Sequence, residues 1–275
     1  AQRGAKVLVN DLGGAVDGSG GSATAAQKVV DEIKARGGEA IANGASVTDF
    51  DAVQAMVQQA IDTWGRVDIL VNNAGILRDK SFGKMELADF RLVLDVHLMG
   101  AVHLCKAAWP HMVAQKYGRI VLTTSSTGLY GNFGQANYGA AKMALVGLMQ
   151  TLSTEGVKYD IRVNCLAPTA ATRMTEGLLP PEVLAALRPE AVVPAMLVAV
   201  SAQAPTRTVF AAGAGTYEVA HVTLTQGVHL GLSPDTPERL LAALPQITER
   251  LGETVPMSGA EQGTNEVTKA LAARR

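Results

Sequence analysis

Apolar runs and amphipathic segments alternate along the chain, and this alternation predicts an α/β fold. Short runs of aliphatic and β-branched residues, bounded by turn-forming residues, predict strands that are buried on both faces of a sheet. Segments whose apolar residues recur with the helical period predict helices. We expect strands over residues 7–10, 39–43, 65–71, 118–122, 161–166 and 208–215, and helices over residues 23–36, 52–64 and 189–200, two within 82–115 and one that opens at Tyr138.

The pattern changes after Ser233, where Pro, Glu and Thr become frequent. One amphipathic helix is expected there, over residues 237–251. We therefore expect a single domain over residues 1–232, followed by an extension over residues 233–275 that packs on the domain or on a partner subunit. At 275 residues the chain is long enough to bury a large core.

Composition and charge narrow the class of protein. Hydrophobic residues make up 48% and charged residues 18% of the chain, which is typical of a globular protein. The net charge is −1, without a dense face of Lys and Arg, and this argues against a nucleic-acid binder. Cys105 and Cys165 have no pairing pattern, and the five histidines form no metal-ligand cluster. With no uninterrupted apolar run of about 18 residues, we expect a cytoplasmic protein without a membrane span.

Three side chains in the middle of the chain suggest proton-transfer chemistry. Ser125 follows the expected strand over 118–122, and in open α/β sheets ligands bind at the ends of strands. Tyr138 and Lys142 are four residues apart, so they project from one face of a helix. A phenol with a pKa near 10 is a poor base at neutral pH, but a nearby positive charge favours the phenolate. Lys142 is placed to supply that charge, and Ser125 to hold a substrate oxygen. A structural reading of a Tyr beside a solvated Lys stays open at this point.

The same spacing, together with an earlier motif, carries a family resemblance. Ser125, Tyr138 and Lys142, preceded by Asn72-Asn73-Ala74-Gly75, resemble the short-chain dehydrogenase/reductase family. The resemblance implies a Rossmann-type, doubly wound parallel sheet in a three-layer α/β/α arrangement. In that fold a strand, a Gly-rich phosphate loop and a helix are expected before the strand over 7–10. The sequence therefore reads as starting inside the first helix.

The resemblance also implies a set of cofactor-binding residues for NAD. Asp11, at the end of an expected strand, would accept bonds from the adenosine ribose and repel the 2′-phosphate of NADP. Its alternative is a turn-forming Asp before two glycines. Lys142 would hold the nicotinamide ribose. The remaining expected cofactor contacts are Ser46, Val47, Asn73, Ala74, Gly75, Tyr138, Pro168, Thr169 and Ala170. Thr169 stands where the family usually has Gly. Residues 170–173 continue this loop, and residues 174–187 are expected to form a substrate lid.

His97 is a departure from the family pattern. It lies where the family usually has an Asn that bends a helix and holds a water in a proton relay. A His side chain can also bind water and backbone groups, so we include it with Ser125, Tyr138 and Lys142 as a candidate catalytic residue. Direct involvement and a purely structural role both remain open.

Local runs at residues 9–14, 73–79, 96–98, 130–138 and 210–215 are similar to the (3R)-hydroxyacyl-CoA dehydrogenase branch of the family, and this similarity covers residues 1–232. It implies NAD-dependent oxidation of a (3R)-3-hydroxyacyl-CoA, or of a hydroxysteroid, to the ketone, with substrate bound by Ser125 and Tyr138, in a homodimer or homotetramer. One alternative is an NADPH-linked 3-oxoacyl reductase, against which Asp11 argues. Another is a truncated, non-catalytic scaffold, because the Gly-rich loop is not seen in the sequence.

Overall fold

The computed structural model describes residues 1–22, 24–171 and 180–274. The chain divides into two compact units, Ala1–Val219 and Ala220–Arg275. The first unit contains every candidate residue named above. The expected lid falls partly on residues 172–179, which lie outside the described residues, and Pro181–Ala186 within it forms helix α7.

The first unit contains two sheets. Strands β1 (Val7–Asn10) and β2 (Ala40–Asn43) pair in parallel, with Val7 opposite Ala40. The second sheet has the order β3-β4-β5-β6-β7, and β3 to β6 are parallel. Its strands are Ile69–Asn72, Gly118–Thr123, Ile161–Thr169, Val209–Gly213 and Thr216–Ala220. The parallel sheet with helices around it confirms the predicted Rossmann-type fold.

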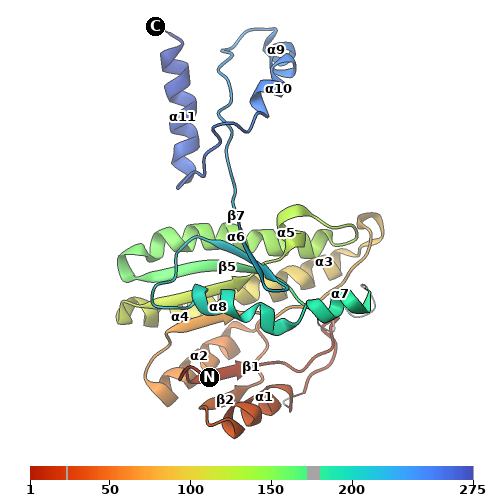
Figure 1. Cartoon of the computed structure of the whole chain (residues 1–275), viewed down its shortest axis with the longest axis vertical. Helices are drawn as coiled ribbons and strands as arrows, with labels where there is room; N and C mark the ends of the chain where they lie inside the picture. The colour runs from red at the N-terminus through yellow and green to blue at the C-terminus, as the bar shows by residue number, and fades with distance from the viewer. Residues whose placement is uncertain (23, 172–179, 275) are drawn as a thin grey trace. The chain divides into compact units, whose positions relative to one another are not determined.

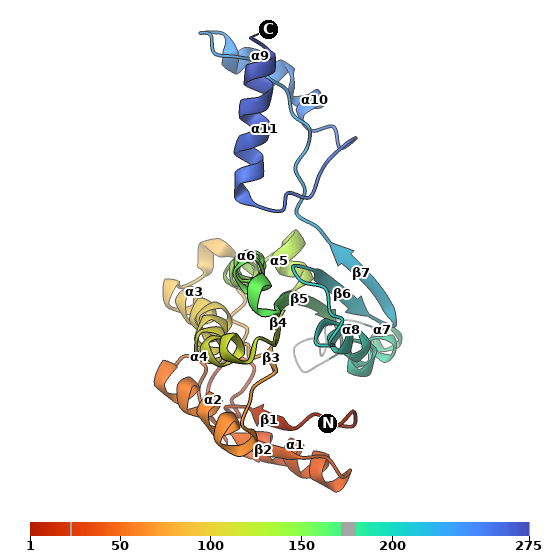
Figure 2. The same ribbon diagram turned by 90° about the vertical axis from the view of Figure 1, so that its left-hand side faces the viewer.

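Helices cover both faces of the five-stranded sheet. Figure 2 shows α3 (Leu87–Leu94), α4 (Gly100–Gln115) and α6 (Ala136–Gly156) on one side and α7 and α8 (Val193–Ala199) on the other. The remaining helices of the first unit are α1 (Thr24–Ala35), α2 (Phe50–Trp64) and α5 (Ser126–Tyr130), with short 3₁₀ turns at Phe82–Lys84, Val157–Tyr159 and Pro189–Ala191. Figure 1 shows α1 and α2 beside the two-stranded sheet.

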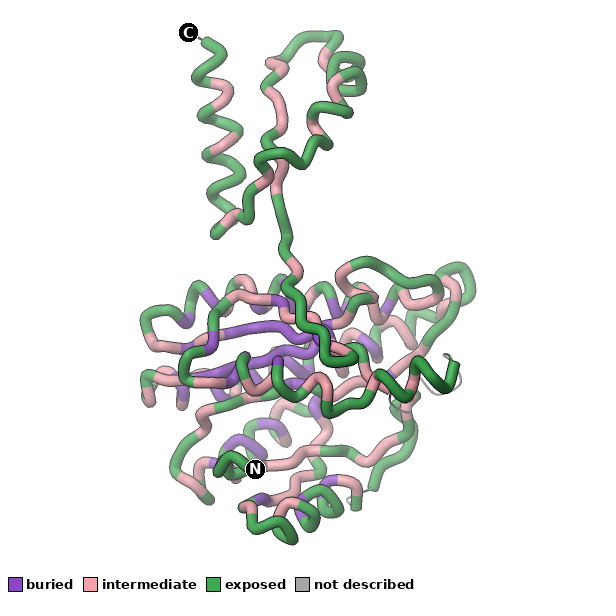
Figure 3. The backbone as a smooth tube through the Cα atoms, viewed as in Figure 1, coloured by how far each residue is buried: buried purple, intermediate pink, exposed green. Residues whose placement is uncertain are grey.

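The core is concentrated on the middle strands. All six residues of β4 are buried. In β5, residues 161–167 are buried except for Arg162, which is partly exposed. Figure 3 shows buried backbone running along these strands. Arg119 of β4 is only 1% exposed and donates to the backbone oxygens of Ser201, Ala202 and Asp160, so its guanidinium is fully paired inside the sheet.

Several expected elements differ from the structure. The strand over 65–71, expected to be central, is the edge strand β3 among the described residues, and its Ile69 and Val71 are 40% and 42% exposed. The last expected strand, over 208–215, is a hairpin. Ala214 and Gly215 both have positive φ, 50° and 78°, and this backbone conformation lets a two-residue turn reverse the chain.

The two helices expected within 82–115 form one helical rod. Leu87–Leu94 passes into a π-helical turn, Asp95–Met99, and then into Gly100–Gln115. The rod is long and apolar enough to span a membrane by length and composition alone. Its residues Val93, Ala101 and Ala108 are each 0% exposed inside the fold, so it is a core helix.

The second unit contains α9 (Thr236–Ala242), α10 (Leu244–Ile247) and α11 (Gly259–Ala272). The single helix expected over 237–251 is therefore wrong, and α11 was not predicted. Pro245 lies in the first turn of α10, where its missing N–H is tolerated, but it cannot continue a preceding helix. None of the described residues 220–274 is buried.

Candidate active site

The candidate residues Ser125, Tyr138 and Lys142 meet because α5 packs closely on α6. Ser125 follows the end of β4 and caps α5, its side chain accepting from the N–H of Thr127 at 3.2 Å. A Cβ on Gly128 would lie 2.7 Å from the Cβ of Lys142. Only glycine allows this approach, which brings the cap of α5 to the first turns of α6.

The hydroxyl groups of Ser125 and Tyr138 interact directly. Burial raises the pKa of the Tyr138 phenol above its ordinary value of 10.0, while the hydrogen bond with Ser125 lowers it and the charge of Asp79 raises it. The net pKa shift is upward. The lowered pKa that the sequence predicts is therefore wrong, because desolvation of the phenolate outweighs the hydrogen bond. At neutral pH the phenol therefore carries its proton.

Lys142 is buried beneath the phenol. Its Nζ donates to the backbone oxygen of Thr123 at 2.6 Å and lies 5.5 Å from the centroid of the Tyr138 ring. The hydroxyl of Thr124 donates to the backbone oxygen of Lys142 at 2.7 Å. Burial lowers the pKa of the ammonium from 10.5 to about 8, although Cys165 partly opposes this. The ammonium is still the main form of Lys142 at neutral pH, and it lies close to the Tyr138 ring.

His97 lies in the π-helical turn and is 1% exposed. Its Nε2 is 2.8 Å from the backbone oxygen and 3.0 Å from the backbone nitrogen of Ile76. Burial, together with the charge of Lys142, lowers the pKa of its imidazole from 6.5 to about 3, so the ring is neutral at pH 7. The ring meets that of Tyr138 edge to face at 5.2 Å between centroids. His97 is thus part of the site, and its role in catalysis stays a prediction.

The expected cofactor residues lie at the carboxyl ends of parallel strands. Asn73 to Gly75 follow β3, and Pro168 and Thr169 end β5, with Ala170 after them. Asn73 is exposed, whereas the preceding Asn72 is buried and its Nδ2 has no partner among the described residues. These positions share one edge of the five-stranded sheet with Ser125, as ligand sites in open α/β sheets do.

Asp11, Ser46 and Val47 follow the two strands of the smaller sheet. One carboxylate oxygen of Asp11 accepts from the N–H of Gly13 at 2.6 Å, so the turn-forming alternative is observed. The side chain of Val47 is buried in a cluster with Leu104, and its backbone oxygen lies 2.9 Å from Nδ1 of His103. The hydroxyl of Ser46 pairs with that of Thr48 at 2.8 Å.

Sequence reasoning missed Asn137, which holds the start of α6 in place. It is 0% exposed, and its Nδ2 donates to the backbone oxygen of Arg78 at 3.0 Å while its Oδ1 accepts from the N–H of Tyr138 at 2.7 Å. Lys80 donates from its backbone nitrogen to Gly134 at 2.9 Å, and Gln135 bonds Asp79 at 2.7 Å. The signal available in the sequence was the amide side chain of Asn137 immediately before the candidate Tyr138.

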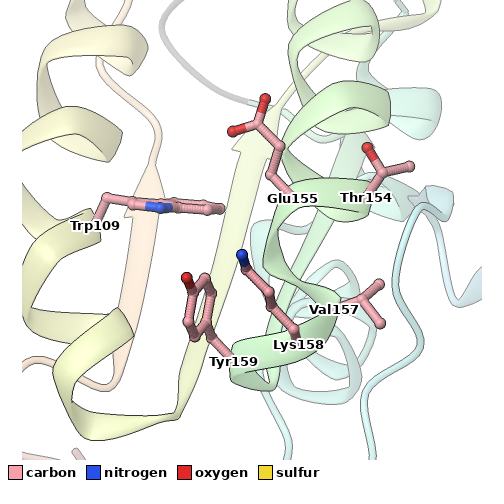
Figure 4. A pocket seen from close by; sticks show the side chains of 6 residues that line it. All are labelled: Trp109, Thr154, Glu155, Val157, Lys158 and Tyr159. Carbon is pink, nitrogen blue, oxygen red and sulfur yellow. The ribbon is translucent and has the colours of Figure 1, made fainter.

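A surface hollow of about 570 Å³ lies elsewhere (Figure 4). The side chains that line it come from α4 and from the end of α6 and the turn that follows: Trp109, Thr154, Glu155, Val157, Lys158 and Tyr159. This turn leads into the amino-terminal end of β5, opposite the edge that carries Ser125. The hollow contains none of the candidate residues. Among the described residues, no group of three His, Cys, Asp or Glu side chains could hold a metal ion.

Comparison with known proteins shows which family and which proteins the chain is similar to. A family model described as short chain dehydrogenase matches residues 5–182. Peroxisomal multifunctional enzyme A of Dictyostelium discoideum is 49% identical over 263 residues, which are 95% of this chain and 58% of that protein. The chain therefore spans little more than half of that relative.

Solved structures agree with the fold. The full-length peroxisomal multifunctional enzyme type 2 of Drosophila melanogaster matches with a TM-score of 0.80 and 34% identity, over 99% of this chain and 46% of that one. A 7α-hydroxysteroid dehydrogenase complexed with NADH and 7-oxoglycochenodeoxycholic acid matches with a TM-score of 0.68 and 29% identity, over 76% of this chain and 84% of that one. The predicted resemblance to the short-chain dehydrogenase/reductase family, based on Ser125, Tyr138 and Lys142 with the motif at residues 72–75, is confirmed.

Proposed function

The chain belongs to the short-chain dehydrogenase family of oxidoreductases, which use nicotinamide cofactors, and from this we propose that it interconverts a secondary alcohol and a ketone with NAD. The alcohol we propose is a (3R)-3-hydroxyacyl-CoA. The observation that carries the proposal is the contact between the Ser125 and Tyr138 hydroxyl groups above the buried Lys142 ammonium.

Each side chain has one task in this reaction. The Ser125 hydroxyl holds the substrate oxygen, and the Tyr138 phenol exchanges a proton with it. Because the phenol is protonated at neutral pH, it is ready to donate a proton to a ketone oxygen. In the oxidising direction it must first lose this proton, and the Lys142 ammonium, 5.5 Å from the ring centroid, stabilises the phenolate that results.

The donor set at the strand ends fits a nicotinamide dinucleotide. The hydroxyl, phenol and ammonium of Ser125, Tyr138 and Lys142 suit sugar hydroxyls and a carbonyl, and Asn73 offers an exposed amide. When bound, the nicotinamide supplies the hydride chemistry. Asp11 supports NAD over NADP, because its exposed carboxylate would repel a 2′-phosphate. A hydroxysteroid is the second candidate substrate, favoured by the likeness to the 7α-hydroxysteroid dehydrogenase.

The decisive variant is Tyr138→Phe, which removes the proton-exchanging oxygen and keeps the ring. We expect kcat to fall by about 10²–10⁴-fold, the usual contribution of a general acid–base group, while NADH binding measured by fluorescence is retained. Tyr159→Phe is the matched control at the opposite end of the sheet, and it should keep full turnover. Near-full turnover of Tyr138→Phe would refute the proposed chemistry.

Substrate and cofactor are tested on the unaltered protein. We expect oxidation of a (3R)-3-hydroxyacyl-CoA with NAD, no oxidation of the (3S) isomer, and slower reaction with NADP. Preferential oxidation of a hydroxysteroid would select the second substrate class. A preference for reducing 3-oxoacyl groups with NADPH would contradict the role given to Asp11. Absence of any NADH binding would support a non-catalytic scaffold.

A further inference from the structure

One side chain, His97, joins the end of β3 to the phenol of Tyr138. It projects from the π-helical turn Asp95–Met99, in which the N–H of Gly100 bonds the oxygen of Asp95, one residue further along than in an α-helix. Such turns occur frequently at functional sites. The widened turn sits within the continuous helical rod, at the level of the candidate site.

On one side the imidazole contacts the backbone that follows β3. Its Nε2 is within hydrogen-bonding distance of both the N–H and the C=O of Ile76, at 3.0 and 2.8 Å. A neutral ring nitrogen either donates or accepts, so each tautomer satisfies one of these two groups. Nδ1 is buried without a partner among the described residues, so the ring is held through Nε2 and Ile76, which accommodates either tautomer.

The ring also occupies the space that a side chain at position 75 would need. A Cβ built on Gly75 would lie 2.3 Å from Cε1 of His97, and 3.0 and 3.2 Å from its two nitrogens. The backbone of Gly75 does not have a positive φ. The requirement for glycine at this position is therefore one of space and not of backbone conformation.

On its other side the imidazole meets the candidate acid–base residue. The planes of the His97 and Tyr138 rings are 89° apart, with the centroids separated by 5.2 Å. Ile76 belongs to a buried cluster with Val93 and Ala141, and Tyr138 packs against the same cluster. The imidazole is therefore in contact with both the loop after β3 and the phenol.

We infer that His97 is a positioning residue: its ring is a spacer that sets the distance between the Gly75–Ile76 backbone and the Tyr138 phenol. Gly75 is the complementary half of this device, because the spacer fits only against a residue without a side chain. This role differs from a proton relay, since it uses the shape of the ring and its bonds to Ile76. The inference depends on the proposed function only where it is tested by kcat, because the structural tests need no activity.

The test is a double-mutant cycle that adds a methyl group at position 75 and makes the side chain at position 97 smaller. Gly75→Ala adds a methyl group that must displace the ring or Ile76, and we expect kcat to fall by about 100-fold, as displacements near 1 Å do. His97→Asn keeps a hydrogen-bonding side chain but removes the ring atom nearest to that methyl. In the double variant, we expect the added methyl to reduce kcat less than in the parent. Gly147→Ala, whose added Cβ meets nothing within 4 Å, is the control and should keep full activity.

The thermal unfolding midpoint of the unliganded proteins gives a second readout. We expect Gly75→Ala to lower it more in the parent than in the His97→Asn background. ¹⁵N NMR of the imidazole should show a neutral ring in the parent, with ring ¹⁵N shifts that change in Gly75→Ala because the added methyl group disturbs its bonds to Ile76. Additive effects of the two substitutions on both kcat and the midpoint would overturn the inference, and would mean that residue 75 matters through a ligand alone.

The two proposals fail separately. If the parent shows no dehydrogenase activity, the proposed function fails, while the coupling of the unfolding midpoints still tests the spacer. Should His97→Asn not fold by circular dichroism, His97→Ser takes its place in the cycle. If both His97 variants unfold, Gly75→Ala alone still tests the spacer: an unfolding midpoint and a kcat equal to those of the parent would contradict it, because the clash it requires is then absent.

Discussion

The two sheets of the first unit are built from similar apolar runs, yet they differ in burial. Every residue of β4 is buried, whereas every residue of β1 is only partly buried. In β2 only Ala40 is buried. Strand β4 leads to the catalytic candidate Ser125, and β5 ends in the cofactor-binding candidates Pro168 and Thr169, whereas the partly buried strands precede the candidates for binding adenosine. The buried part of the fold thus carries Ser125, whose distance from the phenol matters for proton transfer.

The largest expected effect on stability is at the buried guanidinium of Arg119, in the buried strand β4. Arg119→Met leaves the backbone oxygen of Ala202 without this donor and removes one of two donors to the oxygens of Ser201 and Asp160, which keep the N–H groups of Ala204 and Gly118. It also removes the ion pair with the Asp160 carboxylate. Because several bonds of a buried charged group are lost together, we expect the free energy of unfolding in urea to fall by about 3–5 kcal/mol. Arg162→Met is the control from the neighbouring strand. Its side chain is 35% exposed, pairs with Asp160 and donates to the backbone oxygen of Ala204, so a smaller loss of about 1–2 kcal/mol is expected. Equal losses would contradict the special role of Arg119.

A matched pair of isoleucines compares the sheets directly. Ile120 in β4 is 0% exposed, while Ile41 in β2 is partly exposed. Ile120→Ala should cost about 2–5 kcal/mol of unfolding free energy, because it removes buried methyl groups and leaves a cavity. Ile41→Ala should cost clearly less, since part of its surface is already in water. Similar costs in chemical denaturation would show that the smaller sheet is as well packed as the larger.

The free energy of unfolding should depend on pH in acid because of the buried imidazole of His97. Its pKa of about 3 lies below its ordinary value of 6.5. Between these two pH values the unfolded chain binds a proton that the folded chain does not. Stability therefore falls as pH decreases from 6.5 toward 3, by up to about 1.4 kcal/mol per pH unit from this group.

His97→Asn should flatten this part of the stability curve, measured as unfolding free energy against pH. The carboxylates of the chain contribute to both curves alike, so the difference between the variants isolates the imidazole. Parallel curves over the whole range would mean that the ring is protonated in the folded state.

The smallest effect is expected at Asp11, in the less buried region. Asp11→Asn keeps an oxygen for the N–H of Gly13 and removes the charge. Stability should change by less than about 0.5 kcal/mol, as at other exposed positions. The preference for NADH over NADPH should fall by about fivefold, because like charges about 4 Å apart in water repel by about 1 kcal/mol. An unchanged ratio of the two KM values would remove Asp11 from the cofactor site.

The sequence by itself determined the α/β class and the grouping of Ser125, Tyr138 and Lys142. Both follow from local rules: strand and helix periods are visible in short windows, and residues four apart on a helix share a face. The family resemblance followed from the same motif. The errors were at element ends and in the second unit, where a proline divided an expected helix and α11 was missed.

Only the tertiary structure decided the electrostatics and the fit within the site. The pKa of Tyr138 is raised because burial, which depends on the whole fold, outweighs its hydrogen bond with Ser125. The match between the His97 ring and Gly75 joins residues that are 22 positions apart, and β3 lies at the edge of its sheet although its residues are those of a central strand. Local patterns determine which elements form, while desolvation, close approach and strand neighbours depend on what packs against each element.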